Sequence, residues 1–448
     1  MALTKVADRM RVTGNVNVKD YNAVGDGSTD DTAAFVAAIA AGNSVYVPTG
    51  FYKLTSNIVL PYATKMYGDG RGETVLMFSG AINGLTISLH STLNDMWITG
   101  DQNNAAASSN ALLVFAENNS YRTNISNLAI GGTTNGSSTI FSVSTKYGGD
   151  AINSGNTFLV NISGCYIFKC LGFGWDNVLA TGGGPVLNAV NISGTEFHDC
   201  NIGTRLKVIQ GVSFDACTWE NNTQEGLILI DVRSCSINAP YFEANNEQAT
   251  GTYRADLYAE VAASLNITAG FWQRGANCLY GIDIAGTGIA TISGGFFNNY
   301  TGVATHVIRS SVATNLGGFF SNTTALVEVP SSAVQQNWAG SATGVTGLKA
   351  PQIFSINGTT ATLTIGDTED LFTPATRDTG ILTVWATSNN AAYYWSGSVQ
   401  SFTGSSLNIN QFGTGGLLAV NDNAGTIQLE KTGGGSNSAF AWAYVNFQ

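Results

Sequence analysis

One short pattern recurs seven times between Asn161 and Asn322, and only the loops between its copies change in length. Two of the copies read Ile162-Ser-Gly-Cys-Tyr-Ile167 and Ile192-Ser-Gly-Thr-Glu-Phe197. Every copy ends on a large apolar residue, and these residues are Ile167, Phe197, Trp219, Phe242, Trp272, Phe297 and Phe320. They follow one another at intervals of 22 to 30 residues. A period of this length indicates a solenoid, in which each repeat packs only on its neighbours.

The residues within each copy predict strands. They alternate between apolar and polar, they are rich in Ile, Phe, Trp and Thr, and Gly or Asn bounds them. A leucine-rich repeat would need a Leu ladder with a helical turn, and no loop here has one. We therefore predict an all-β fold, a parallel β-helix in which aligned positions lie one coil apart. A small residue two positions after the first apolar residue predicts a tight corner, at Gly164, Gly194, Ala216, Ala239, Ala269 and Gly294.

The charge of the chain limits its partners. Charged residues make up 11% of the 448 residues, well below the roughly 25% of ordinary soluble domains. Acidic residues outnumber basic ones, and the net charge is −11. This excess argues against nucleic acid and against an anionic membrane as partners. Neutral polymers, and polymers recognised locally, remain open.

Cysteine usage and the N-terminus predict neither a metal centre nor a membrane anchor. The six cysteines form no CxxC pair and have no His at zinc-ligand spacing. We expect them to be reduced and buried, with Cys170 stacked on Cys200, and we predict no metal and no cofactor. The first residues contain no apolar signal segment, and no later run is long enough to span a membrane. We expect synthesis in a cytoplasm.

The most specific local signature lies between Val16 and Leu54. It reads as a strand, the Gly-rich turn Gly25-Asp-Gly27, a short helix, and a strand. Thr29 or Asp30 would cap the helix, and Phe35, Val36 and Ile39 would point inward. Because a solenoid exposes its open end, we expect this helix to cover it. We interpret the acidic Gly-Asp-Gly cluster as a turn and a helix cap.

This signature, together with Gly68-Asp-Gly-Arg-Gly-Glu-Thr-Val-Leu76, resembles the start of the pectate-lyase-like right-handed β-helix proteins. The preceding Leu3-Thr-Lys-Val-Ala-Asp-Arg-Met10 resembles bacteriophage tailspikes and related tail depolymerases within that group. The resemblance is strong over about 75 residues, and the later coils agree in kind. It implies a virion tail protein that forms a homotrimer, contacts other phage tail proteins and acts on a bacterial surface polysaccharide.

Composition and strand spacing predict four segments. They are an N-terminal cap with the start of the β-helix (1–78), the parallel β-helix (79–329), a linker (330–350) and a C-terminal β-sandwich (351–448). In tailspike-like proteins such a sandwich helps to hold the trimer and can bind sugar. We expect its aromatic residues, including Trp385 and Trp395, to pack in the core or at the trimer interface.

Strand alternation also locates a site. If the large apolar residues point inward, the residues on either side of them point outward on one face. These outward residues include Glu196 with His198, Thr218 with Glu220, Tyr241 with Glu243, and Phe271 with Gln273. We predict Glu220, Glu243 and Glu196 as catalytic residues, and His198, Thr218, Tyr241, Phe271, Gln273 and Arg274 as substrate-binding residues.

Glu220 and Glu243 share a register on adjacent copies, so their β-carbons should lie roughly 5 Å apart. Stacked carboxylates destabilise a sheet and raise one pKa, which suits the acid and base of glycoside hydrolysis. Glu196 and Glu220 lie one coil and two residues apart, so the distance between their β-carbons should be about 8 Å. The shorter spacing is typical of retaining enzymes and the longer one of inverting enzymes.

We therefore expect a tailspike that depolymerises a surface polysaccharide by endo-glycosidic hydrolysis. A polysaccharide lyase is the second reading, because His198, Tyr241, Arg205, Arg254 and Arg274 could bind a uronate and abstract its proton. The aligned residues are carboxylates, however, and this favours hydrolysis. A noncatalytic receptor-binding tail protein on the same scaffold is the third reading.

Overall fold

The computed structural model describes residues 15–316, except 117–119, 138–139, 141, 178–185 and 301–305. Beyond residue 316 it describes only the paths of strands. The chain divides into two compact units, residues 1–288 and residues 289–448. The tailspike signature at Leu3 to Met10 lies outside the described residues.

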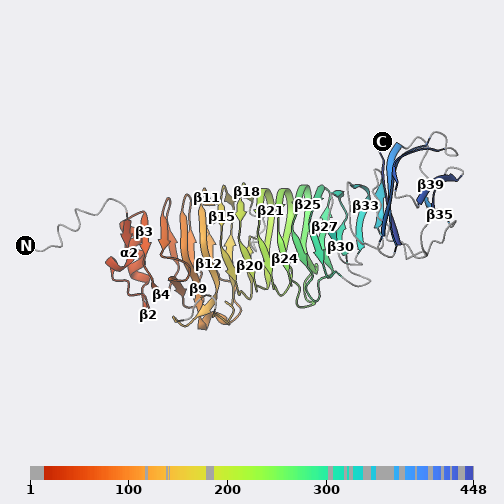
Figure 1. Ribbon diagram of the computed structural model, residues 1–448. Coiled ribbons are helices and arrows are strands. Elements are labelled where there is room, and N and C mark those ends of the chain that lie inside the picture. The colour runs from red at the N-terminus through yellow and green to blue at the C-terminus, as the bar shows by residue number, and fades with distance from the viewer. Residues whose placement is uncertain are drawn as a thin grey trace, which may run out of the picture. The chain divides into compact units, whose positions relative to one another are not determined.

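The first unit is a parallel β-solenoid, as the repeats predict. Its strands cross the axis coil after coil, each hydrogen-bonded to the strand one coil away (Figure 1). One sheet contains the short strands β16 (Tyr166–Phe168), β20 (Glu196–His198), β22 (Thr218–Glu220), β24 (Tyr241–Glu243) and β26 (Phe271–Gln273), all paired in parallel. Longer strands carry the chain around the rest of each coil, namely β21 (Ile202–Asp215), β23 (Leu227–Asn238) and β25 (Ala255–Thr268).

The predicted aromatic column fills the core. Phe197, Trp219, Phe242 and Trp272 pair in register and are fully buried. Their rings stack, with centroids 5.7, 4.8 and 5.9 Å apart along the series and interplanar angles of 8 to 11°. Offset stacking is a favoured geometry for aromatic rings. The column therefore holds successive coils in one register.

The predicted corners are also present. Gly164 and Gly194 have φ of 60 and 52°, and Ala216, Ala239 and Ala269 take the same left-handed conformation at 48, 46 and 55°. A residue with a β-carbon is uncommon there, and the smallest side chain limits the strain. The repeated small residue thus marks a turn of the backbone in every coil.

The one α-helix among the described residues, α2 (Thr32–Ala41), lies beside the first strands of the solenoid (Figure 1). Phe35 is fully buried against Tyr52, with ring centroids 5.4 Å apart. The prediction for Val36 was wrong, because its side chain is 53% exposed and Ala38 is buried instead. Alanine is apolar but small, so an Ala-rich sequence does not indicate which helix face points inward.

The acidic residues around the Gly-Asp-Gly turn bind backbone amides. Asp26 accepts hydrogen bonds from the amides of Ser28 and Thr29, and Asp31 accepts them from Val24 and Gly25. Asp30 accepts from the amide of Thr32, the first residue of α2. These bonds are those of a turn. The N-cap residue of α2 is Asp31 rather than Thr29 or Asp30, and its side chain makes no capping hydrogen bond.

All six cysteines are free and buried, as predicted. The Cys170 and Cys200 thiols lie in contact, and burial followed by this neighbour raises the pKa of Cys170 above its ordinary value. Thiols in such surroundings behave as small apolar groups. No helix in the described part of the chain has the length and apolarity to cross a membrane.

In the second unit, parallel pairing continues through β28 (Ile289–Ser293), β31 (Ala313–Leu316), β33 (Leu326–Gln335) and β34 (Val345–Lys349). The end of β33 and the whole of β34 therefore fall within the predicted linker, 330–350. Two antiparallel sheets follow, β35-β40-β39 and β38-β37-β36-β41. The packing of these sheets and the predicted sandwich aromatics lie outside the described residues. The sandwich, the trimer and the domain boundaries remain predictions.

Asp150 supplies a test of how burial acts within the coils. Burial raises its pKa from 3.8 to about 6, although its carboxylate accepts the Phe173 amide at 2.8 Å. Because the folded-state pKa is raised, the fold favours the protonated carboxyl, and this contribution to stability is fully present below pH 3.8. It is lost as the pH rises through about 6 and the buried carboxyl ionises. Asp150→Asn keeps the acceptor and removes the charge.

We expect the free energy of unfolding of Asp150→Asn, relative to that of the wild type, to increase by about 2 kcal/mol between pH 4 and pH 8. Urea unfolding of both proteins at the two pH values measures this change. An equal difference between the proteins at both pH values would contradict the role given to burial.

Candidate functional site

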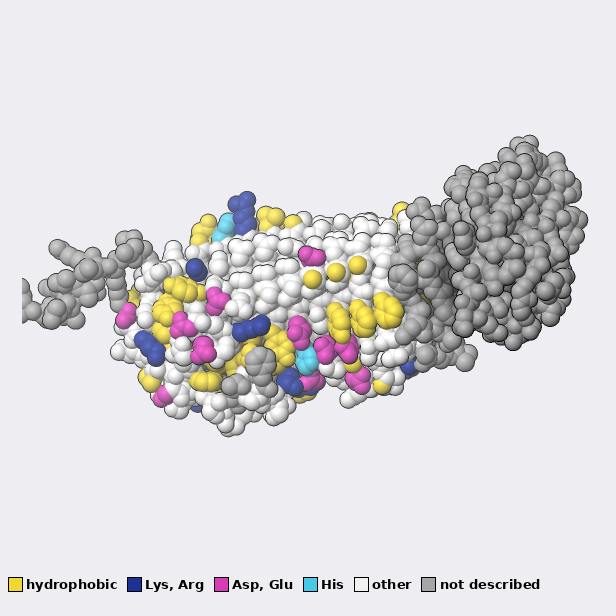
Figure 2. All heavy atoms as spheres, in the orientation of Figure 1, with side chains coloured by type: hydrophobic (Ala, Val, Ile, Leu, Met, Phe, Trp, Pro, Cys, Tyr) yellow, Lys and Arg dark blue, Asp and Glu magenta, His cyan; other side chains and the backbone are white. Residues whose placement is uncertain are grey.

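The outward residues of the short-strand sheet form two columns. Glu196 pairs with Thr218, which pairs with Tyr241 and then Phe271. His198 pairs with Glu220, which pairs with Glu243 and then Gln273. All eight side chains are partly exposed, so both columns face outward as predicted. Figure 2 shows acidic, histidine and apolar side chains gathered on this face, which we call the acidic face.

Glu220 and Glu243 are neighbours in register, as the repeat predicts. The Tyr241 hydroxyl donates a hydrogen bond to the Glu243 carboxylate, so Glu243 has a partner of its own. The Tyr241 ring stacks on Phe271, with centroids 5.2 Å apart and an interplanar angle of 14°. This pair offers a flat apolar surface next to the carboxylates.

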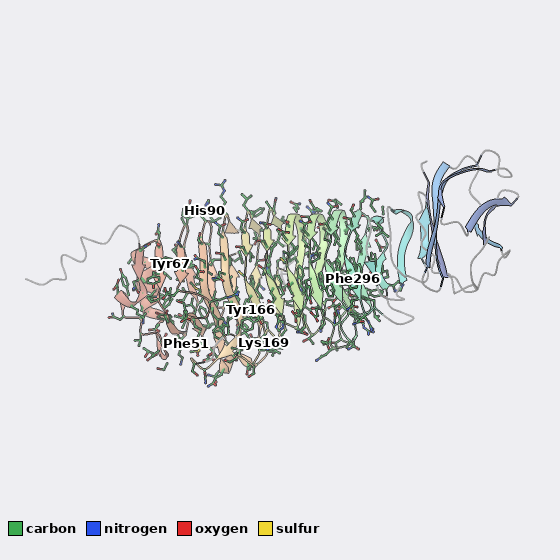
Figure 3. The ribbon with its side chains drawn as sticks, in the orientation of Figure 1. Phe51, Tyr67, His90, Tyr166, Lys169 and Phe296 are labelled. Atoms are coloured by element: carbon green, nitrogen blue, oxygen red, sulfur yellow. The ribbon has the colours of Figure 1, made fainter. Side chains whose placement is uncertain are left out.

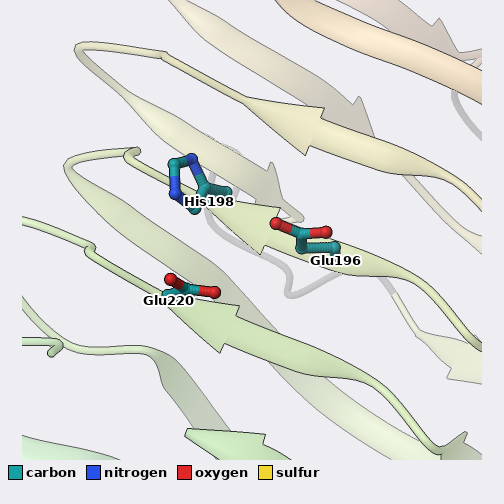
Figure 4. Close-up of side chains that lie close together, drawn as sticks. All are labelled: Glu196, His198 and Glu220. Carbon is teal, nitrogen blue, oxygen red and sulfur yellow. The ribbon is translucent and has the colours of Figure 1, made fainter. Parts of the chain in front are cut away.

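Three ionisable groups converge at the other end of the acidic face. A carboxylate oxygen of Glu196, one of Glu220 and a ring nitrogen of His198 all lie within 4.8 Å of one another (Figure 4). Asn221 joins two of them, because its amide nitrogen lies 3.2 Å from His198 Nε2 and donates to Glu220 Oε1 at 3.2 Å. The Tyr166 hydroxyl lies 3.5 Å from His198 Nδ1.

The surroundings shift the pKa of two of these groups, Glu196 and His198. Burial, and then the charge of Glu220, raise the pKa of Glu196 above 4.5, against a smaller effect of Arg71. Burial lowers the pKa of His198 below 6.5, against the opposing charges of Glu220 and Asp199. Near neutral pH the imidazole is therefore uncharged. Two carboxylates in different surroundings are typical of acid and base pairs.

A cavity of about 370 Å³ opens beside Glu196. It is lined by Arg71, Ile140, Gly164, Cys165, Tyr166, Gly194 and Glu196. Arg71 reaches it from the loop before β7 (Thr74–Phe78), and its Nη1 lies 3.5 Å from the Gly164 carbonyl. Sequence reasoning missed this residue. Its Gly68-Asp-Gly-Arg71 motif indicates lineage, and nothing in the motif indicates which later coil the arginine reaches.

An insertion between β12 (Asn124–Thr134) and β13 (Asp150–Ser154) covers the coils that precede the cavity. Its Ile140 and Val143 pack with Trp97 and Phe168 in an apolar cluster outside the solenoid core. Ile140 also lines the cavity, so the insertion supplies one wall of the site.

The same insertion brings a lysine to the site. Lys146 Nζ lies 2.7 Å from one oxygen of Asp199, and Lys169 Nζ lies 2.8 Å from the other. Lys169 directly follows β16, close to Tyr166 (Figure 3). Asp199 directly follows His198, so this ion-pair cluster adjoins the acidic face. Neither lysine was predicted, because their meeting with Asp199 depends on the path of the insertion.

The remaining predicted residues are placed as follows. Thr218 lies between Glu196 and Tyr241, and Gln273 follows Glu243 in its column. Arg274 lies just after β26, and its Nε donates to the Cys278 carbonyl at 2.7 Å. Two arginines of the lyase reading are engaged elsewhere, Arg205 with Asp176 at 2.7 Å and Arg254 with the Asn277 carbonyl at 3.0 Å.

Glu196, His198 and Glu220 are also close enough to share a metal ion. A histidine with two carboxylates is a donor set that binds zinc or other first-row divalent ions. The prediction that the chain uses no metal or cofactor therefore stays a prediction, which a chelator tests directly.

Residues 15–228 match the family described as Rhamnogalacturonase A/epimerase, pectate lyase-like. The pre-neck appendage protein of Bacillus phage B103 is 37% identical over 99 residues, which cover 22% of this chain and 11% of that protein. Alginate lyase 7 of Azotobacter vinelandii is 34% identical over 110 residues, or 20% of this chain and 13% of that protein. The chain thus spans about a tenth of the length of these curated relatives.

Among solved structures, the tailspike gp42 of Acinetobacter phage vb_AbaP_AS12 resembles the chain with a TM-score of 0.55. The likeness covers 90% of this chain and 81% of that one, at 11% identity. At this identity the likeness concerns the fold, which agrees with the solenoid seen here.

Proposed function

We propose that this chain, a pectate lyase-like right-handed β-helix protein of the phage tailspike type, binds and cleaves a bacterial surface polysaccharide. The pre-neck appendage relative and the tailspike fold support a place in the virion. Trimer formation and contact with other tail proteins belong to the same proposal. The cleavage reaction follows from the acidic face.

The convergence of Glu196 and Glu220 carries the proposed reaction. Glu196 keeps its proton to a higher pH than an ordinary glutamic acid, so it serves as the general acid. It gives the proton to the glycosidic oxygen as the bond to the sugar carbon breaks. Glu220 supplies the carboxylate that attacks this carbon, and water then releases the sugar and returns the proton to Glu196.

The spacing of the two carboxylates supports this sequence of steps. Their closest oxygens lie within 4.8 Å, which is nearer to the roughly 5 to 5.5 Å of retaining enzymes than to the roughly 6.5 to 9.5 Å of inverting ones. We therefore assign the acid to Glu196 rather than to Glu243, which the Tyr241 hydroxyl engages. Glu243, Tyr241 and Phe271 bind the sugar units beyond the cleaved bond.

β-Elimination is the second candidate, because His198 is a neutral base at the centre of the site. The lowered pKa of its imidazole leaves it free to accept a proton near pH 7. Tyr166, 3.5 Å from His198 Nδ1, could then protonate the leaving oxygen. The likeness to an alginate lyase supports this reading.

Polysaccharide from a sensitive host distinguishes the reactions. We expect new reducing ends, a retained anomeric configuration in the first product by NMR, and no absorbance near roughly 235 nm, where unsaturated uronates absorb. Absorbance at that wavelength means elimination, and binding without new ends means a noncatalytic adhesin.

Added EDTA leaves hydrolysis unchanged, whereas loss of activity that zinc restores means that Glu196, His198 and Glu220 hold a metal.

The pH dependence follows from the two shifted groups. We expect the rate of hydrolysis to fall as the pH rises through the pKa of Glu196, which lies above the ordinary value of 4.5. Elimination would instead need neutral His198, and its rate would rise through a pKa below 6.5. Initial rates at polysaccharide concentrations well below saturation, which give kcat/KM and so report the free enzyme, measure the profile between pH 4 and pH 9. A rate that only rises over this range contradicts the role of Glu196 as the acid.

A further inference from the structure

The floor of the cavity beside Glu196 is bare backbone. Gly164 and Gly194 line it, and a β-carbon added to either would meet no atom within 4 Å. The corner itself does not require glycine, because Ala216 takes the same left-handed conformation on the next coil. The missing methyl groups therefore leave open space where a ligand can approach the backbone.

Arg71 lines the cavity, and most of its guanidinium hydrogen-bond donors are unused. Its guanidinium makes one long hydrogen bond, 3.5 Å to the Gly164 carbonyl, and no carboxylate of the described residues lies within ion-pair distance of it. The side chain is partly buried. A guanidinium has five donors in a rigid fork that matches a carboxylate. A neutral sugar would leave most of this fork unpaired.

A second source of positive charge lies near His198. Lys146 and Lys169 share the single carboxylate of Asp199, so this cluster has an excess of one positive charge. Both lysines lower the pKa of His198, although less than burial does. Neither lysine lines the cavity, so Arg71 is the cation among its lining residues, in a chain with only 19 Lys and Arg and a net charge of −11.

We propose that this cavity is the subsite for an acidic sugar, whose carboxylate Arg71 binds through two parallel hydrogen bonds while Tyr166 contacts the ring. The proposal rests on the proposed function, because it names the class of the polysaccharide: an acidic polymer with a uronate-type unit next to the cleaved bond. Bidentate pairing to a carboxylate supplies both affinity and orientation.

Three uronate polymers serve as probes: alginate, polygalacturonate and hyaluronate, each in its native form and after chemical reduction of its carboxyl groups to alcohols. Binding is measured by affinity electrophoresis in a Glu220→Gln background, which prevents cleavage. The added variants are Arg71→Gln, Arg71→Lys and Gly194→Ala. Arg233→Gln is the matched control, because Arg233 pairs with Asp231 on β23 and does not line the cavity.

We expect at least one native polymer to bind, and reduction of its carboxyl groups to weaken binding at least tenfold. Arg71→Gln should weaken binding of the native polymer equally and leave the reduced polymer unaffected. Arg71→Lys should restore part of the affinity, because it keeps the charge without the fork. Gly194→Ala should weaken binding of both forms by filling the floor, and the Arg233 variant should match its parent.

Equal binding of native and reduced polymers overturns the proposal, as does an Arg71→Gln variant that weakens both forms alike. Failure of all three native polymers to bind overturns it too. Cleavage is measured separately with the wild type. Carboxylate-dependent binding without cleavage would refute the proposed reaction and leave the acidic-sugar subsite standing.

Discussion

Glu220→Gln should lower the rate of polysaccharide cleavage by about 10³-fold while binding persists, because it removes the carboxylate that attacks the sugar carbon. The substitution keeps the shape of the side chain, and the glutamine oxygen can still accept from Asn221, which donates to Glu220 at 3.2 Å. Glu196→Gln should cause a loss of similar size, because an amide cannot give up a proton. Reducing-end assays at saturating polysaccharide measure both losses.

Glu243→Gln decides which carboxylate pairs with Glu220. Register alone pairs Glu220 with Glu243, whereas the closeness of the carboxylate oxygens favours Glu196. We expect a loss of about tenfold or less for Glu243→Gln, since a neutral side chain there can still accept from Tyr241. A large loss for Glu243→Gln together with an active Glu196→Gln would return the acid to Glu243. Full activity of Glu220→Gln would remove both pairs.

Trp219→Ala should destabilise the solenoid by about 3 to 5 kcal/mol, the usual cost of truncating a fully buried aromatic side chain. Trp219 has no exposed surface, and its ring stacks between Phe197 and Phe242 at 5.7 and 4.8 Å. Its indole nitrogen also donates to Thr204 Oγ1 at 3.0 Å, so the variant leaves a buried hydroxyl without its donor. Thermal and urea unfolding measure the loss.

Two variants control for this effect. Trp219→Phe keeps a ring in the stack and should lose much less stability than Trp219→Ala. Val59→Ala, at a side chain that is 52% exposed, should change stability by less than about 0.5 kcal/mol. Because each coil packs only on its neighbours, amide exchange in Trp219→Ala should increase first in β20 and β24. If Trp219→Ala unfolds at the same temperature and urea concentration as the wild type, the aromatic column does not stabilise the solenoid as expected.

The sequence predicted much of the solenoid because residues at matching positions of successive repeats become neighbours when the coils stack. Trp219 and Phe242 are buried in register, and Glu220 and Glu243 follow them outward, since strand side chains alternate faces. The asparagines near the turns do not share one environment. Asn222 and Asn245 form a buried hydrogen bond of 2.8 Å, whereas Asn161 is exposed although it bonds Asn124 in the same manner.

The repeats by themselves thus determined the fold, the inward column and the acidic face, because copies of one aligned pattern leave one register in which every coil buries its large residues. Only the tertiary structure decided that Glu196, His198 and Glu220 converge and that Arg71 and Lys146 join them. Loops of unequal length have no period. Where their side chains end depends on the packing of Ile140 and its neighbours over the coils, which no local pattern encodes.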